Sequence, residues 1–215
     1  METDKIPMMH AKRTEPEKPS AAADISTVDL VAKAQNGDQT AFHRLVDQFQ
    51  PGIYRMIFYR TRSQMDAEDL TQDVMLKAYK NIGRLKSSEG FRSWLYSIAV
   101  NRVKDYYRKK QFRSLFGVAS VDEEGFHETA EMAVAPEVEG GISKKDFWRQ
   151  IGRMMTSLSA MEKEIFLLRF FDQLTINEMS AALHKSESTI KTHLYRALSK
   201  IKATAGEWEG LLEGL

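Results

Sequence analysis

The chain has 215 residues, 42% of them hydrophobic and 28% charged, which suits one large globular domain or two small ones. It contains no cysteine, which excludes a disulfide framework, a thiolate metal site and a cysteine nucleophile. No apolar run approaches the roughly 18 residues of a membrane span and no signal-peptide pattern opens the chain, so we expect a cytoplasmic protein. None of the five histidines forms an H-x-x-x-H pair, and we expect neither a metal nor a cofactor.

The charge is distributed unevenly along the chain, although the net charge is only +1. Residues 24–113 carry a net charge of +6 and residues 144–215 a net charge of +2, while residues 114–143 contain no Lys or Arg and carry −7. Proteins that bind polyanions concentrate positive charge where they make contact. Two basic segments separated by an acidic one therefore favour a nucleic-acid partner.

Residues 1–23 contain three of the five prolines and no apolar periodicity, and we interpret them as a disordered leader. Helical spacing of apolar residues then predicts several helices in a first domain, residues 24–113. Capping residues, Pro51 and apolar spacing predict that these helices begin near Ser26, Asp38, Pro51, Asp66 and Phe91, the last running to about Gln111.

Residues 114–143 have no sustained periodicity and are predicted to be a flexible acidic linker. A second domain, residues 144–203, is again helical, and a tail of residues 204–215 follows. Its predicted helices are capped at Ser143, Ser159, Thr175 and Ser186. No segment alternates with the period of a strand, so the predicted fold is all-α: two small helical domains joined by a flexible acidic linker.

The end of the second domain has the spacing of a helix-turn-helix, with a short helix at 176–183, a tight turn and a longer helix at 187–202. Once Ile190 and Leu194 face the core, the second helix exposes polar and basic side chains that can approach base edges in a major groove. An ordinary helical hairpin with a solvated face remains the alternative.

The long helix of the first domain carries a polar stripe of Ser97, Asn101, Lys104 and Arg108. Aromatic residues lie among its basic residues, a combination that suits single-stranded nucleic acid. Individual aromatics such as Trp94 and Tyr106 fit a hydrophobic core better than a stacking platform, so the polar stripe is the stronger indication.

Two pairs of segments together resemble bacterial RNA polymerase sigma factors of the extracytoplasmic-function (ECF) subfamily. Asp66–Tyr79 followed by Phe91–Arg102 resembles the N-terminal domain of that family, and Leu174–Leu183 followed by Ser188–Ala197 resembles its C-terminal domain. The resemblance implies a transcription initiation factor that binds core RNA polymerase and promoter DNA. It further implies restraint by an anti-sigma factor, no enzymatic activity and no small-molecule substrate.

The resemblance also implies three sets of contact residues. The expected polymerase contacts are Asp66, Asp69, Gln72 and Asp73. The expected contacts to the melted −10 element are Arg84, Lys86, Ser87, Ser88, Ser97, Asn101, Lys104 and Arg108. The expected contacts to the −35 duplex are Ser188, Lys191, Thr192, Tyr195 and Arg196.

Two rival interpretations stay open from the sequence. A helix-turn-helix regulator that acts without being a polymerase subunit would explain residues 175–202 but would leave Asp66–Arg102 without a role. An enzyme that uses the abundant carboxylates as a metal or acid–base site has no phosphate-binding glycine loop or Ser/His pair to support it.

Overall fold

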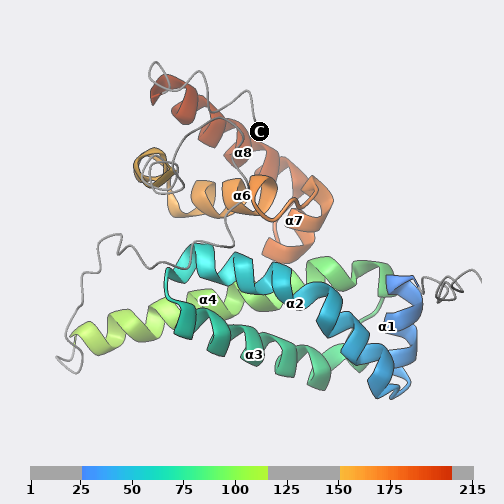
Figure 1. Ribbon diagram of the computed structural model, residues 1–215. Coiled ribbons are helices and arrows are strands. Elements are labelled where there is room, and N and C mark those ends of the chain that lie inside the picture. The colour runs from blue at the N-terminus through green and yellow to red at the C-terminus, as the bar shows by residue number, and fades with distance from the viewer. Residues whose placement is uncertain (1–25, 116–150, 205–215) are drawn as a thin grey trace, which may run out of the picture.

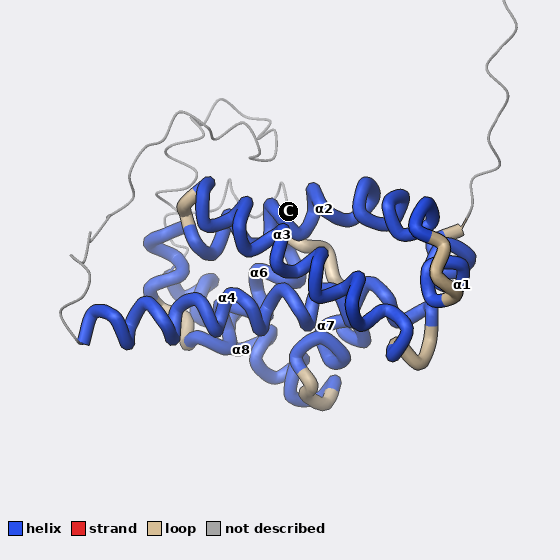
Figure 2. The backbone as a smooth tube through the Cα atoms, turned by 90° about the horizontal axis from the view of Figure 1, so that it is seen from below, coloured by secondary structure: helices blue, strands red, loops and turns tan. Residues whose placement is uncertain are grey.

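The computed structural model describes residues 26–115 and 151–204, and within these ranges it contains helices and no strand (Figures 1 and 2). The all-α prediction is confirmed for this part of the chain. The predicted leader, the helix start at Ser143, all but the first residue of the predicted tail and all but the first two residues of the predicted linker lie outside the described residues.

The first two helices begin where their capping residues predict. In α1 (Thr27–Gln35) the Ser26 side chain accepts a hydrogen bond from the Asp29 N–H at 3.2 Å. The helix ends at Asn36 and Gly37, whose φ of +91° is accessible to glycine without strain. Asp38 then caps α2 (Gln39–Thr61), accepting from the Ala41 N–H at 3.0 Å.

The prediction that Pro51 opens a separate helix is wrong. Pro51 lies inside α2, which continues unbroken for 23 residues. Proline within a helix removes one backbone hydrogen bond and costs about 3 kcal/mol. Ile53, Met56 and Ile57, all 0% exposed, follow it on the buried face. Burying each of these three side chains stabilises the helix by roughly 1.5–3 kcal/mol, and the sum outweighs the cost of the proline.

The helix α3 (Gln64–Asn81) begins two residues before the predicted Asp66, because Ser63 is its N-cap and accepts from the Asp66 N–H at 3.3 Å. Two short 3₁₀ helices, Ile82–Arg84 and Ser88–Gly90, form the connection to α4 (Phe91–Leu115). The connection is therefore partly ordered into turns rather than being an open polar loop.

Toward the C-terminus the structure contains helical residues 151–156, α6 (Ala160–Phe170), α7 (Ile176–Leu183) and α8 (Glu187–Thr204). The predicted caps at Ser159 and Thr175 are confirmed, and both are capping boxes. Ser159 pairs reciprocally with Glu162 at the start of α6, and Thr175 pairs reciprocally with Glu178 at the start of α7.

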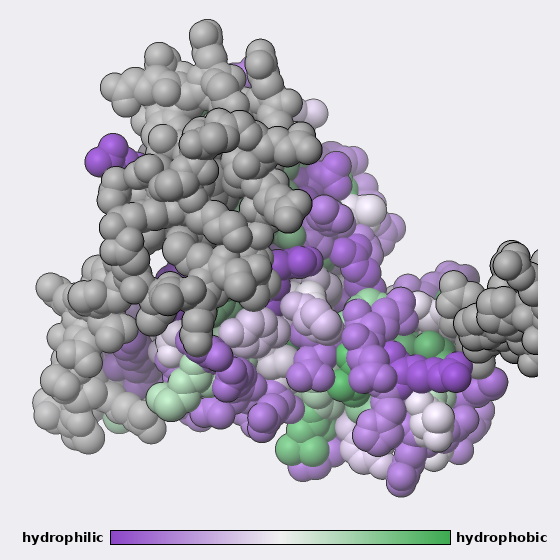
Figure 3. Space-filling view, in the orientation of Figure 1, coloured by the Kyte–Doolittle hydropathy of each residue, from purple (hydrophilic) through white to green (hydrophobic). Residues whose placement is uncertain are grey.

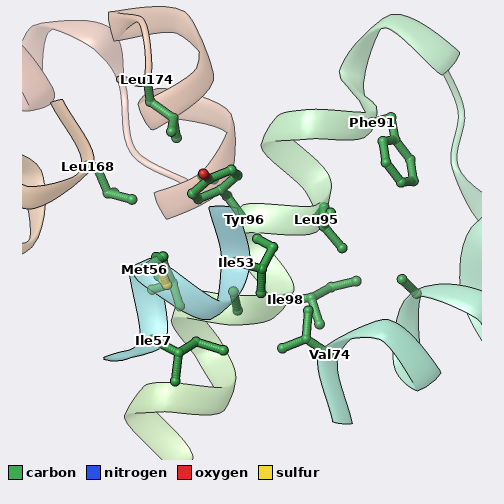
Figure 4. Close-up of a cluster of buried hydrophobic side chains, with 14 of the residues drawn as sticks. Ile53, Met56, Ile57, Val74, Phe91, Leu95, Tyr96, Ile98, Leu168 and Leu174 are labelled. Carbon is green, nitrogen blue, oxygen red and sulfur yellow. The ribbon is translucent and has the colours of Figure 1, made fainter. Parts of the chain in front are cut away.

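The C-terminal helices α6–α8 pack directly against the N-terminal helices α1–α4, and α7 lies on α4 (Figures 1 and 2). The contact is partly apolar. Tyr96 of α4 lies between Ile53 on one side and Leu174 of the C-terminal helices on the other (Figure 4). One hydrophobic cluster therefore runs through both sets of helices.

On the face shown in Figure 3, the described residues are mainly hydrophilic, with small hydrophobic patches over the lower helices. None of the described helices combines the length and apolar character that crossing a bilayer requires.

Candidate nucleic-acid interface

The helix-turn-helix predicted from the sequence is present in the structure. The helix α7 ends at His184, whose φ of 52° places it in the left-handed conformation. Ser186 accepts a hydrogen bond from the Thr189 N–H at 3.2 Å and caps the start of α8. Met179 and Ile190, both 0% exposed, lie in the core and fix the packing of α7 and α8.

One face of α8 is buried and the opposite face is open to solvent. Ile190, Ala197 and Ile201 are buried. The five residues expected to contact the −35 duplex are all exposed: Ser188, Lys191, Thr192, Tyr195 and Arg196. Tyr195 is 73% exposed, which is unusual for a large aromatic side chain and leaves its ring free to contact a ligand. The face combines short hydroxyls with basic groups, as base-edge and phosphate contacts require.

The polar stripe on α4 is only partly accessible. Asn101, Lys104 and Arg108 are exposed. Ser97 is buried, and its hydroxyl donates to the Trp94 carbonyl at 2.7 Å. The hydroxyl of Ser97 is therefore occupied within the helix in this arrangement.

The connection between α3 and α4 is held by side chains that the sequence analysis did not single out. The Gln35 amide donates to the carbonyls of Ile82 and Leu85 at 3.1 and 2.8 Å. Ser93 donates to the Gly90 carbonyl at 3.0 Å. Within the described ranges, no hydrogen bond joins Asn101 to this connection. Of the expected −10 contacts in this connection, Arg84, Lys86 and Ser87 are exposed and Ser88 is half-buried.

The residues expected to contact polymerase follow one side of α3. Asp69, Gln72 and Asp73 are exposed. Asp66 is half-buried and accepts a hydrogen bond from the Tyr106 hydroxyl at 2.9 Å. Asp73 forms an ion pair with Arg102 of α4. The carboxylates therefore line a hollow that they share with the basic side chains of Arg102, Lys109 and Lys110.

Beside these carboxylates, α2 and α3 form an open groove with apolar walls, and Leu76 and Tyr79 at its edge are 52% and 47% exposed. Exposed apolar side chains that adjoin a row of carboxylates suit a protein partner that is both basic and apolar.

A set of ion pairs joins the N-terminal helices to the C-terminal helices. The Arg60 guanidinium of α2 donates to Glu164 at 2.9 Å and to Asp172 at 3.1 Å. Arg92 of α4 donates to Glu178 at 2.8 Å and to the Asp172 carbonyl at 2.8 Å. We call these five residues the interdomain clamp.

The Arg60–Asp172 part of the clamp lies out of water, whereas Arg92 and Glu178 are partly exposed. The side chains of Arg60 and Asp172 are 5% and 0% exposed. Burial alone would lower the pKa of Arg60, but the carboxylates of Glu164 and Asp172 raise it above its ordinary value, so it stays charged. Burial also raises the pKa of Asp172, and the lowering effect of Arg60 only partly opposes this. The carboxylate of Asp172 is thus the less well stabilised partner.

The clamp could not be found from local sequence patterns, because its partners lie 80 to 112 residues apart. Glu178 alone belongs to a local pattern, the capping box that begins α7. Among residues 26–115 and 151–204, no group of three or more His, Asp or Glu side chains is arranged to hold a metal ion.

Comparison with known proteins identifies both halves of the chain. Residues 45–113 match the family model for sigma-70 region 2, and residues 148–201 match that for sigma-70 region 4. The ECF RNA polymerase sigma factor BldN of Streptomyces coelicolor is 32% identical over 191 residues, which cover 84% of this chain and 67% of that protein. The ECF RNA polymerase sigma-E factor of Escherichia coli K12 is 27% identical and covers 80% of this chain and 90% of its own length.

Solved structures agree with this at the level of the fold. The structure of CnrH in complex with the cytosolic domain of CnrY has a TM-score of 0.62 at 19% identity, over 86% of this chain and 100% of that chain. The sigma factor RpoE of Bartonella quintana, in complex with the anti-sigma factor NepR, has a TM-score of 0.58 at 19% identity, over 75% of this chain and 94% of that chain. The helix-turn-helix, the matches to regions 2 and 4 and the similarity to BldN lead to one conclusion: the chain belongs to the ECF sigma factors, the non-catalytic initiation factors that bind core RNA polymerase and direct it to promoters.

Proposed function

We propose that this sigma factor reads its promoter with two separate surfaces and binds polymerase with a third. The domains that carry them are assigned to residues 24–113 and 144–203, with residues 114–143 as the linker. The observation that carries the proposal is the open face of α8. All five side chains assigned to the −35 duplex are exposed there, while the buried side of the same helix is formed by Ile190, Ala197 and Ile201.

The −10 element is assigned to the connection after α3 and to the exposed part of α4. Lys104 and Arg108 are placed to neutralise phosphates, and the Asn101 amide offers donors and an acceptor for a base edge. The hydrogen bonds that shape the connection come from Gln35 and Ser93. Asn101 is exposed and does not hydrogen-bond to the connection, so its amide is available to an unpaired base.

The polymerase surface is assigned to the acidic side of α3. Asp69 and Asp73 supply negative charge and Gln72 a polar group between them, while Leu76 supplies apolar area nearby. Like charges at i and i+4 disfavour an isolated helix slightly, and a basic partner would relieve that repulsion. Binding to polymerase also places the protein in the cytoplasm.

Two related folds were solved as complexes: CnrH with the cytosolic domain of CnrY, and the sigma factor RpoE with the anti-sigma factor NepR. We extend this to the present chain and propose that an anti-sigma factor restrains it. A pull-down from the native host with the full-length protein as bait would test this. Recovery of core polymerase alone, under conditions in which the regulated promoters are silent, would contradict it.

The substitution Asn101→Ala tests the −10 assignment most directly. The holoenzyme would first select promoters from a random duplex library, and single-stranded oligonucleotides that carry the selected −10 sequence would then be titrated. A base contact predicts a loss of about 1–3 kcal/mol of discrimination at one position. The salt dependence of binding should stay unchanged, because the phosphate contacts remain.

The matched control is Gln111→Ala, which removes another exposed amide from α4. It should leave position preferences intact. If Asn101→Ala weakens binding equally at all positions, or blurs several preferences at once, Asn101 shapes the site and does not contact a base. If the wild-type holoenzyme shows no preference for any single-stranded −10 sequence, the melting mechanism is wrong.

A further inference from the structure

A single side-chain amide of α1 holds two points of the connection between α3 and α4. Gln35, the last residue of α1, donates from its amide nitrogen to the carbonyl of Ile82 at 3.1 Å and to the carbonyl of Leu85 at 2.8 Å. A primary amide carries two N–H groups, so both donors of Gln35 are engaged. The two contacts join residues that are 47 and 50 positions apart in the sequence, so they form only in the folded protein.

The two carbonyls bracket the first 3₁₀ turn of the connection. The Leu85 N–H donates to the Ile82 carbonyl at 3.0 Å and closes this turn. Ile82 is buried in the core, and Leu85 packs against the same hydrophobic cluster. Between them lie Gly83 and the exposed Arg84. Arg84 therefore projects from a turn that is held at both ends.

The stretch of residues 85–87 lies between the two 3₁₀ turns. The second turn has hydrogen bonds of its own, from the Gly90 N–H to the Ser87 carbonyl at 3.1 Å and from the Ser93 hydroxyl to the Gly90 carbonyl at 3.0 Å. Among the described residues, Gln35 is the side chain that hydrogen-bonds to the backbone of residues 85–87. Its amide is therefore the polar anchor of this stretch.

The side chains assigned to the −10 element in this connection depend on the backbone for their placement. Arg84, Lys86 and Ser87 are exposed, and within the described residues their side chains form no hydrogen bond. An unpaired base is recognised through hydrogen bonds to its edge, and these weaken steeply with distance and angle. A shift of the backbone would therefore change which base is preferred, even if every side chain that touches DNA were kept.

The position of α1 does not depend on this amide. The helix lies where α3 passes into α4 and packs against both 3₁₀ turns (Figure 1). The side chains of Leu30, Val31 and Ala34 are 5%, 0% and 8% exposed, and Ser26 caps the start of the helix. Apolar burial therefore keeps α1 in place, and the half-buried Gln35 is left with a local task.

We propose that Gln35 is a positioning residue for −10 recognition: by holding the carbonyls of Ile82 and Leu85, it sets the base preference of the connection without contacting DNA itself. The inference rests on the proposed function of this connection as part of the −10 surface. It gives α1, which carries none of the expected DNA contacts, a part in the choice of promoter.

Two substitutions test this role. Gln35→Met removes both donors, and methionine has nearly the length and the helix propensity of glutamine. Gln35→Glu keeps the shape as well but sets an acceptor-only carboxylate against two carbonyl oxygens, so it should displace the connection further.

The matched controls change Gln48 of α2, whose amide donates to the Thr27 hydroxyl of α1 at 3.1 Å. Gln48→Met removes an amide hydrogen bond to the same helix but away from the connection. Gln48→Glu corrects for the general effect of an added negative charge on DNA binding.

Each variant is assembled with core polymerase. The holoenzyme is then titrated with single-stranded oligonucleotides that carry the −10 sequence selected by the wild type, with one base changed at a time. The measured quantity is the ratio of two affinities, which does not depend on the fraction of active protein. Circular dichroism before assembly checks that each variant is folded.

We expect Gln35→Met to reduce discrimination about 2- to 12-fold at one or two positions, the range that corresponds to one net hydrogen bond. Gln35→Glu should reduce it more. Preferences measured on the −35 duplex should stay as in the wild type, and so should all preferences of the Gln48 variants.

Wild-type ratios at every −10 position in Gln35→Met would overturn the proposal, whatever the effect of Gln35→Glu. An equal loss on all oligonucleotides, or loss of the folded state, would also overturn it, because Gln35 would then support the fold and not the base preference. The same changes in the Gln48 variants would assign the effect to α1 as a whole and not to the Gln35 amide. Failure of the proposed function looks different, because then the wild-type holoenzyme itself would not discriminate between −10 sequences.

Discussion

Replacing Arg60 by methionine would measure how much the buried ion pair contributes. Methionine keeps much of the volume of arginine but removes the guanidinium that lies 3.1 Å from Asp172 and 2.9 Å from Glu164. Asp172 is 0% exposed and would keep a buried, unpaired charge. Breaking one side of such a pair costs about 3–5 kcal/mol.

That cost has an upper limit set by the architecture. The two partners belong to separate helical bodies, the N-terminal helices α1–α4 and the C-terminal helices α6–α8. Asp172 can therefore regain water if the two bodies come apart. We therefore expect Arg60→Met to uncouple the two bodies before either unfolds. Urea denaturation followed by circular dichroism should show one transition for the wild type and two for the variant, each with a smaller dependence on urea, since each exposes less surface.

The double variant Arg60→Met/Asp172→Leu supplies the control. An apolar pair of similar volume is often neutral or stabilising by about 1–4 kcal/mol relative to a buried ion pair. A single transition should therefore return. Our account of the contact would be refuted if the double variant were as destabilised as Arg60→Met, or if Arg60→Met changed the free energy of unfolding by less than about 0.5 kcal/mol.

Three further predictions follow from the described surfaces and ion pairs. Arg196→Ala should cost about 1–3 kcal/mol of discrimination at one base pair of the −35 duplex, measured by anisotropy on a panel of substituted duplexes. An equal loss of affinity for every duplex would instead indicate a phosphate contact. Changing Asp69 and Asp73 to lysine should abolish co-elution with core polymerase while leaving the protein folded, since both side chains are exposed; a folded double variant that still co-elutes would remove α3 from the polymerase surface. The hydrogen bond from Lys200 lowers the pKa of Glu162 from 4.5 to about 2. The stabilisation by the ionised carboxylate is therefore complete above about pH 4.5 and is lost as the pH falls towards 2. In urea titrations across that interval, Glu162→Gln should lose less stability than the wild type.

Local chemistry explains why much of the fold could be predicted from the sequence. A capping side chain and its target lie three residues apart, so Ser26, Asp38 and Thr175 indicate their helices without any knowledge of the tertiary structure. The exposed face of α8 was also predictable, because the buried residues of an amphipathic helix determine which residues remain outside. Pro51 was misinterpreted for the opposite reason: the burial that carries α2 through it is a tertiary effect.

The contact between the two bodies was beyond the reach of sequence patterns. Arg60 and Arg92 look like ordinary basic residues on amphipathic helices, and their partners follow 80 or more residues later. For the same reason the burial of Ser97 was not foreseen. Its spacing places it on the polar stripe, but its burial depends on which helices pack against that part of α4.

The order of the helices along the chain also has a consequence for the time at which the protein is made. The helices α1–α4 pack mainly on their neighbours in sequence and are complete at Leu115, whereas α8 ends at Thr204. Nascent chains grow at about 5–20 residues per second, so the intervening 89 residues take roughly 4–18 s to synthesise. Contacts between near neighbours form far faster than that. During each round of translation, α3 and the whole length of α4 are therefore folded and uncovered for several seconds before the helices α6–α8 are complete and can pack on the N-terminal helices.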